Sequence, residues 1–273
     1  MSQNKYLFVV LLTVLSLLSA DVAMSKQLSD NSNKHNLSST ATHGGPHSDT
    51  VASGGTDQIC IFCHTPHSAT PESTLWSRPD PNTTTFPLYN SALVIKGDYP
   101  GSSGSSTGTE AISDYKDDGS VIYPSGASRL CLSCHDGVTA IGILNDGTWI
   151  AMTEDYVTND TTSPVIDLSK SHPISFIYDT PVLTAINNFR TGGTGDTYKL
   201  PQNLTVFTPL DGENKMQCTT CHDPHEDTRA DGTYDLLPFW RHQGNGTSYE
   251  DVCNACHIGI PAFSGTNHNS ATL

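Results

Sequence analysis

Hydrophobic residues along the chain are concentrated in one run near the N-terminus and are scattered elsewhere. Leu7 to Leu18 is a largely apolar run of twelve residues, and no later segment approaches it in length. The rest of the pattern predicts short strands at Thr148–Met152, Ile174–Tyr178 and Leu204–Phe207. We expect no long amphipathic helix outside the run, so regular structure should fall well below the usual levels of roughly a third helix and a fifth strand.

The apolar run belongs to a segment, residues 1–25, with the pattern of a secretory signal peptide. Lys5 gives it a weakly positive start, and cleavage is expected after Ala20 or Ser25. A transmembrane anchor would need about 20 apolar residues, and Asp21 ends the run earlier. We therefore expect an exported protein, extracellular or at the cell surface or alternatively periplasmic, with no membrane span in the mature chain.

Beyond this leader the chain divides into a polar arm, residues 26–59, and a single domain, residues 60–273. The arm is rich in Ser, Asn, Thr and Gly, a composition typical of disorder. Within the domain, residues 101–119 are rich in Gly and Ser and then acidic, and we expect a surface loop there. Residues 190–216 are expected to form another loop.

Composition and charge limit the possible partners and point to a cofactor. Counted with Gly and without Tyr, apolar residues make up roughly 40% of the chain, below the usual level of about 45–50%. A bound apolar cofactor would make up the missing core. The formal net charge is −15, which argues against nucleic acid as a partner, because phosphate binding depends on Lys and Arg.

The pattern Cys-x-x-Cys-His occurs four times and accounts for all eight cysteines. It is the attachment signal for haem c: the two thiols add to the haem vinyl groups, and the histidine becomes the proximal iron ligand. The predicted thioether residues are Cys60, Cys63, Cys131, Cys134, Cys218, Cys221, Cys253 and Cys256, and the predicted proximal ligands are His64, His135, His222 and His257.

Three other uses of cysteine fit the pattern poorly. A disulfide scaffold would not place a histidine after every pair, and zinc modules do not need that histidine four times. Thioredoxin-like chemistry expects one motif on a βαβ frame. The proximal histidines lie 71, 87 and 35 residues apart, which is too irregular for a solenoid or propeller repeat.

Histidine is the favoured second axial ligand. Met152 and Met216 are the methionines that follow the leader, too few for four irons, whereas eight histidines remain besides the proximal four. His67 and His225 each follow a proximal histidine by three residues, with a proline between. Such a residue lies on the same side of the porphyrin as its neighbour, so we expect it to reach the iron of an adjacent haem, within about 10 Å.

The other histidines differ in their local setting. His172 precedes a proline in apolar surroundings and is a good ligand candidate. His35, His43 and His47 all lie in the polar arm, and their settings do not separate them. The last two, His242 and His268, have polar neighbours and are expected at the surface.

The chain resembles the exported tetrahaem c-type cytochromes with a doubled C-x-x-C-H motif, the OmcE-type family, whose members polymerise into extracellular filaments. The similarity covers most of the mature chain in order, although the loops between the matching stretches do not match closely. The H-x-P-H doublets and the K-H-N-L-S and S-H-P blocks are more specific than the haem motifs. The matching stretches are Lys34–Ser38, Ile59–His67, Leu75–Arg78, Leu130–Gly137, Ser171–Pro173, Cys218–His225 and Cys253–His257.

The resemblance implies a multihaem cytochrome c fold, with mostly irregular coil, short helices at the motifs and a few short β-strands around a stacked chain of four covalently bound haem c groups. It implies His35, His67, His172 and His225 as distal ligands, which favours His35 over His43 and His47. In filament-forming relatives one distal histidine comes from the adjacent subunit, and His35 is the candidate for that role here.

These expectations favour electron transfer over catalysis, because six-coordinate irons leave no position for a substrate. We expect a head-to-tail homopolymer that exchanges electrons with redox proteins or mineral acceptors. One alternative is a soluble monomeric periplasmic electron shuttle. The other is a multihaem reductase that acts on a small oxyanion at a five-coordinate haem.

Overall fold

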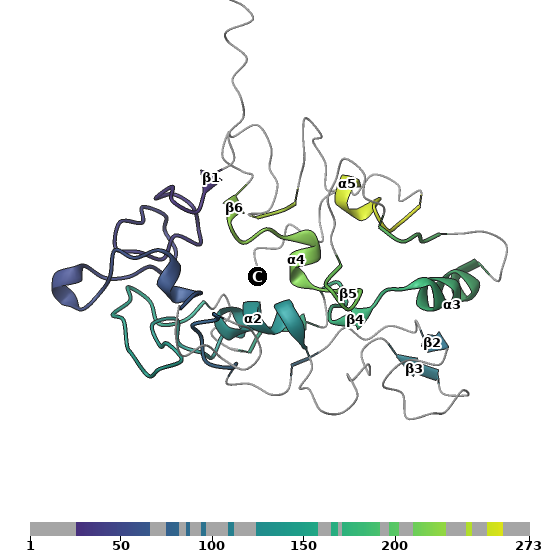
Figure 1. Cartoon of the computed structure of the whole chain (residues 1–273), viewed down its shortest axis with the longest axis horizontal. Coiled ribbons are helices and arrows are strands. Elements are labelled where there is room, and N and C mark those ends of the chain that lie inside the picture. Colours follow the sequence, from purple (N-terminus) through teal and green to yellow (C-terminus); the bar gives the residue numbers. More distant parts are fainter. Residues whose placement is uncertain are drawn as a thin grey trace, which may run out of the picture.

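The computed structural model of the chain (Figure 1) has a short helix at each of the four cysteine motifs. The expected signal peptide, His67, Leu204–Phe207, His242 and His268 lie outside the described residues. The described residues are 26–65, 75–81, 86–87, 94–96, 109–111, 124–157, 165–168, 171–191, 197–201, 210–227, 239–241 and 250–258.

Helices are short and few in the part of the chain that the structure describes. The longest are α2 (Gly126–His135) and α3 (Thr180–Thr191). The others are the 3₁₀ turns η1 (Val51–Ser53) and η2 (Cys60–Phe62) and the four-residue helices α4 (Cys218–Cys221) and α5 (Glu250–Cys253). Among the described residues, no helix has both the length and the apolar character needed to cross a membrane.

The strands form three antiparallel pairs. The pairs are β1 (Lys26–Gln27) with β6 (Glu226–Asp227), β2 (Val94–Lys96) with β3 (Thr109–Ala111), and β4 (Phe176–Ile177) with β5 (Lys215–Met216). Lys26 lies opposite Asp227 and Phe176 opposite Met216, so two of the pairs join segments that are far apart in the sequence.

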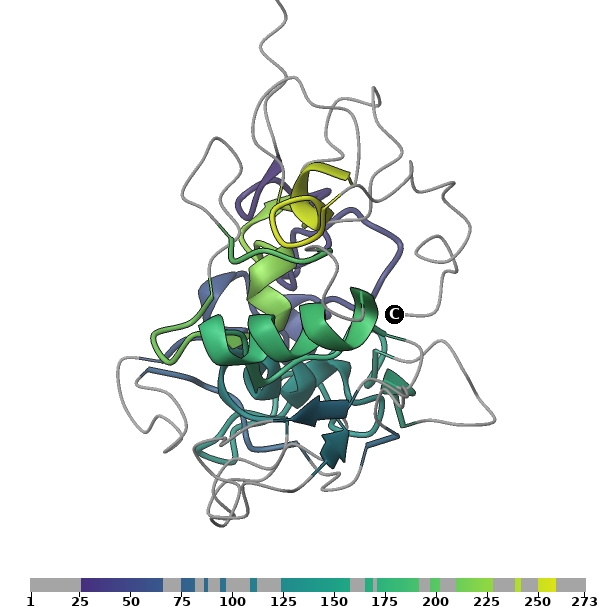
Figure 2. The same ribbon diagram turned by 90° about the vertical axis from the view of Figure 1, so that its right-hand side faces the viewer.

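Helix α3 was not expected, because we predicted no long amphipathic helix after the leader. Its start has clear signals: Asp179 Oδ1 accepts a hydrogen bond from the Val182 N–H at 3.1 Å, and Pro181 occupies the first turn. Val182 and Ile186, four residues apart, are buried together against Phe176. Figure 2 views the helix from the side, with β2 and β3 below it and α5 above.

Two predictions about strands and loops were also wrong in part. Strand β3 lies inside the expected surface loop at 101–119, because it pairs with the β-branched run of β2. Thr148–Met152 is not a strand; it makes isolated bridges, one from Trp149 to Ile143 and one from Met152 to Ser48. Strand β4 takes two residues of the strand expected at Ile174–Tyr178.

The segment 26–59 packs against the rest of the chain. The Asp49 N–H donates to the Ala151 carbonyl at 2.8 Å, and the Thr153 N–H donates to the His47 carbonyl at 2.8 Å. Asn36 is fully buried, and its Oδ1 accepts from the Ser38 hydroxyl at 2.7 Å. Short polar side chains therefore order this segment by hydrogen-bonding its own turns. Figure 1 shows it beside the loop that follows α2.

The apolar side chains are distributed over several small clusters. One contains Phe176, Val182 and Met216, another Phe62 and Ile150; a third is formed by Phe86, Leu132 and Leu168, and a fourth by Trp240 and Val252. Motif cysteines belong to or pack against three of the clusters: Cys256, Cys63, Cys221 and Cys253. The polypeptide thus places its apolar residues around the motifs.

Candidate haem sites

Each Cys-x-x-Cys-His motif lies at a helical turn. The His64 N–H donates to the Cys60 carbonyl at 2.8 Å, the His222 N–H to the Cys218 carbonyl at 3.0 Å, and the His257 N–H to the Cys253 carbonyl at 2.9 Å. The second motif forms the last turns of α2. One helical turn brings residues i, i+3 and i+4 to the same side, which is the arrangement that two thioethers and a proximal histidine need. None of the eight cysteines forms a disulfide.

The cysteines of consecutive motifs lie close to one another in the structure. Burial raises the pKa of Cys63 to about 12, and Cys134 of the second motif adds to that rise. The Cys131 and Cys218 thiols share a hydrogen bond that raises the pKa of Cys131 and lowers that of Cys218. Burial also raises the pKa of Cys221 to about 12, with added effects from both cysteines of the fourth motif. Each motif therefore interacts electrostatically with the next.

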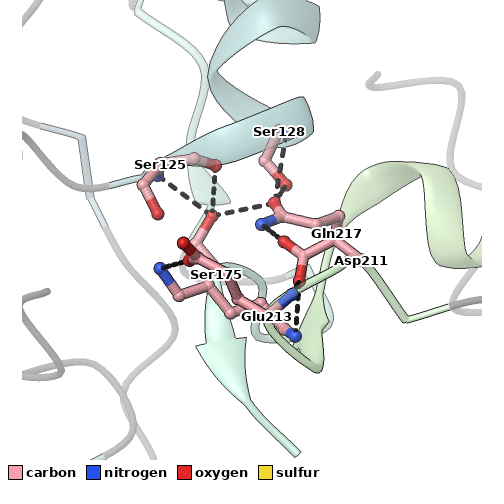
Figure 3. A network of polar contacts seen from close by, with 7 residues as sticks. Ser125, Ser128, Ser175, Asp211, Glu213 and Gln217 are labelled. Carbon is pink, nitrogen blue, oxygen red and sulfur yellow. Dashed lines mark hydrogen bonds and ion pairs between the residues drawn. The ribbon is translucent and has the colours of Figure 1, made fainter. Parts of the chain in front are cut away.

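A polar network holds the second and third motifs together (Figure 3). Gln217, which is buried at the start of α4, accepts hydrogen bonds at Oε1 from the N–H and the hydroxyl of Ser128, at 3.2 and 2.6 Å. The Ser128 hydroxyl in turn accepts from the Cys218 N–H at 3.0 Å. Gln217 Nε2 donates to Asp211 at 2.8 Å. These bonds fix α2 against α4 and so set the separation of Cys131 and Cys218.

Three pairs of histidine rings have their centroids at nearly the same distance from each other. Each pair joins the proximal histidine of one motif to a histidine from another part of the chain. The pairs are His64 with His225, with ring centroids 6.4 Å apart, His35 with His135, 6.0 Å apart, and His172 with His257, 6.4 Å apart.

This spacing fits an iron between the rings. With a metal–nitrogen bond of about 2 Å on each side and half of each ring beyond it, two axial imidazoles have centroids about 6 Å apart. The interplanar angles are 12°, 61° and 83°, and all are allowed because each ring can rotate about the iron–nitrogen axis. The described residues contain no group of three or more possible metal ligands; a haem iron needs two, since the porphyrin supplies the other four.

Hydrogen bonds at the second ring nitrogen orient two of the distal candidates. His35 Nδ1 lies 2.9 Å from the Pro224 carbonyl, and His172 Nδ1 lies 2.8 Å from the Pro173 carbonyl. A carbonyl accepts a hydrogen bond from an Nδ1–H group, and in that tautomer the lone pair of Nε2 is available for a metal. His35 also stacks on Phe239 at 3.9 Å between centroids. Both rings are held in the form that binds iron.

Burial favours the neutral form of His135 as well. It lowers the pKa of His135 to about 4, and His35 and His222 lower it further while Asp136 acts in the opposite direction. Because the neutral imidazole is the form that coordinates a metal, His135 is ready to act as a ligand at neutral pH.

His43, one of the three histidines that the sequence did not separate, has both ring nitrogens engaged. Nε2 lies 2.9 Å from the Asn36 carbonyl, and Nδ1 accepts from the Gly45 N–H at 3.1 Å. His47 packs against His43 with ring centroids 5.7 Å apart. The geometry therefore favours His35 as the ligand from this segment. His67 lies outside the described residues.

Sequence reasoning assigned no role to three aromatic residues that lie against the proximal histidines. Trp76, Trp240 and Tyr198 form antiparallel bridges with His64, His222 and His257, respectively. The ring centroids of these three pairs are 5.8, 5.3 and 4.7 Å apart.

The backbone pattern of this bridge is the same in all three cases. In the first motif the Ser77 N–H donates to the Cys63 carbonyl at 2.9 Å, and the Thr65 N–H donates to the Leu75 carbonyl at 2.9 Å. Leu75 and Phe239, the residues before the two tryptophans, both have positive φ, 70° and 62°. Two tryptophans that each follow a motif were the available sequence signal, but the bridge itself depends on tertiary structure.

A search against protein-family profiles and a search of curated proteins found no match to this chain. The four motifs and the geometry around them therefore carry the functional information.

Proposed function

We propose that the chain is a tetrahaem c-type cytochrome that transfers electrons. The observation that carries this proposal is the recurrence of three histidine pairs, with centroids 6.0–6.4 Å apart, each containing the proximal histidine of a different motif. A fourth histidine pair, His43 with His47 at 5.7 Å, contains no proximal histidine, and both ring nitrogens of His43 are engaged by backbone groups. Each bound haem would supply an iron that gains and loses one electron.

The same geometry supports a pairing of ligands. His225 follows His222 by three residues but faces His64, the proximal histidine of the first motif. We infer that each of these pairs would supply the two histidine ligands of one haem iron. His67, three residues after His64, would be the distal ligand opposite His222. His35 would be the distal ligand opposite His135, and His172 the one opposite His257. The first and third motifs would then exchange distal ligands, as the argument from the two porphyrin faces requires.

Histidine on both sides of every iron leaves no position for a substrate, so we propose an electron carrier and not an enzyme. The order of the cysteine pairs supports a path through the four haems in sequence order. The chain's own residues act by holding neighbouring motifs close, as the network of Ser128, Gln217 and Asp211 does between the second and third.

We further propose that the exported protein polymerises and passes electrons to an extracellular acceptor. The ring of His35 lies 6.0 Å from that of His135 in the same chain, so this geometry does not favour His35 as a ligand donated between subunits. Polymerisation would then use other contacts. The expected acidic surface suits cationic or mineral partners.

The test is a haem count together with a spectrum of the mature protein. Mass spectrometry should find four covalent haems, and the ferric protein should be entirely low-spin. A count below four would overturn the tetrahaem assignment. A high-spin component that binds cyanide or nitrite would favour the reductase. Electron microscopy of the same sample then separates a filament from the monomeric shuttle.

A further inference from the structure

Arg78 is a fully buried guanidinium surrounded by backbone carbonyls. Its two terminal nitrogens donate to four carbonyl oxygens, which belong to the end of α2 and to the loop that follows it. The acceptors are Ile141, Ile143 at 2.6 Å, Ser133 at 3.2 Å and Ala140 at 2.7 Å.

No carboxylate pairs with Arg78 among the described residues, and its buried Nε has no hydrogen-bond partner there. Arg129, by contrast, binds Asp80 through two nitrogens. A buried cation without a counter-ion is costly, so the presence of Arg78 at this position calls for an explanation.

The charge lies between the first and second motifs. One terminal nitrogen of Arg78 donates to the Ser133 carbonyl at 3.2 Å, and Ser133 directly precedes Cys134. The N–H of Ser77, the residue before Arg78, donates to the Cys63 carbonyl. The chain therefore places Arg78 beside the first motif as well as beside Ser133. The sulfurs of both motifs therefore experience a positive potential from this side chain.

A positive potential at a haem favours its reduced state. When a ferric iron gains one electron and becomes ferrous, the charge of the site falls by one and no bond or proton changes. A nearby cation stabilises that change, and burial keeps water and salt from screening it.

We propose that Arg78 raises the reduction potentials of the haems held at Cys60/Cys63 and Cys131/Cys134 above that of the haem at Cys218/Cys221. This inference rests on the proposed tetrahaem function and adds a direction to it: electrons would accumulate on the first two haems.

The third motif provides an internal comparison. Arg241 directly follows Trp240, much as Arg78 follows Trp76 by two residues. Arg241 is less deeply buried, and its terminal nitrogen lies 3.4 Å from the Asp223 carboxylate, which offsets its charge. The haem at Cys218/Cys221 therefore receives less positive potential from its arginine. Asp136, the buried carboxylate beside the second motif, accepts its hydrogen bonds from Val138 and Thr139 and not from Arg78.

The experiment is a potentiometric titration of the intact four-haem protein, followed by visible spectroscopy and by nuclear magnetic resonance of the haem methyl groups. Arg78→Gln removes the charge but keeps an amide that can donate to the carbonyls. We expect the potentials of two haems, the first and second, to fall, and Arg78→Lys to restore them. Arg241→Gln, the matched control, should leave those two haems unchanged.

The proposal is overturned if Arg78→Gln and Arg78→Lys shift the potentials alike, if all four haems shift together, or if none does. If Arg78→Gln does not fold, the test uses the wild-type protein. The reduction potentials of its first two haems must lie above that of the third, and the difference must persist at high salt. Four low-spin haems without such a gap would refute the role of Arg78 and leave the proposed function intact. A low haem count would refute the function itself.

Discussion

The ring of His225 lies nearly parallel to that of His64, at an interplanar angle of 12° with centroids 6.4 Å apart. His225 is only three residues from His222, yet its ring pairs with His64, which belongs to a different motif. The Nδ1 atom of His225 lies 3.5 Å from the Asp223 carboxylate, which also accepts a hydrogen bond from the His225 N–H at 3.0 Å.

Replacing His225 with Ala should alter the haem at Cys60/Cys63 and not the one at Cys218/Cys221. All four haems should remain attached, because the thioethers are untouched, and the first should become high-spin after losing its distal ligand. Electron paramagnetic resonance detects the change, and nuclear Overhauser contacts to the motif identify the haem. His47→Ala is the control and should leave every haem low-spin. A change at the third haem alone would contradict the pairing.

His35→Ala should make the haem at Cys131/Cys134 high-spin without preventing assembly. The reason is that His35 faces His135 within one chain. Spectra and electron micrographs of the variant test both parts. If filaments are lost while the spectra of the dissociated protein are unchanged, His35 must act between subunits and not within one chain.

Gln217→Ala should lower the free energy of unfolding by about 1–3 kcal/mol, since it removes the acceptor of the buried Ser128 N–H and hydroxyl and the donor to Asp211 Oδ2. Denaturation by guanidinium chloride provides the measurement. Glu154→Ala is the control: this side chain is exposed, so the expected change is within about 0.5 kcal/mol. Equal losses in the two variants would mean that Gln217 has no special role.

His43 should make stability depend on pH below about 6.5. Burial lowers the pKa of His43, and the nearby Lys34 and His47 lower it further, while the hydrogen bond to Asn36 opposes them. The unfolded chain then binds the proton more readily than the folded one, so stability is complete above the unfolded pKa and falls as the pH drops toward the folded value.

The comparison is denaturant unfolding at pH 5 and pH 7.5 for the wild type and for His43→Gln, which cannot take up a proton. The wild type should lose more stability than the variant between the two pH values. Identical losses would assign the acid sensitivity to other groups.

The sequence was sufficient for features that depend on local spacing. Each motif defines its own turn, as at Cys60–His64, and the polar segment 26–59 could be seen to contain three candidate histidines. Which of the three faces a motif could not be read, because it depends on hydrogen bonds such as that from the His43 ring to Asn36. The role of Trp240 was hidden for the same reason: its bridge to His222 joins residues that are 18 positions apart in the sequence.

Helix α3 shows a different limit. Its start was marked by Asp179 and Pro181, but its apolar face is narrow, and Asn187 lies among the buried positions. Asn187 Oδ1 accepts from the Tyr198 N–H at 2.8 Å, so a polar residue that weakens the helical pattern is explained by a partner that sequence periodicity does not reveal.

The separation of His64 from His225 has a consequence for biogenesis. An exported chain emerges from its N-terminus, and the first motif would receive its haem while the residues that complete the iron site are still 161 positions away. On the proposed pairing, the first haem stays open on one face until the third motif has crossed the membrane. A chain cut short before that point would carry an exposed, reactive iron, and quality control could recognise it by that defect.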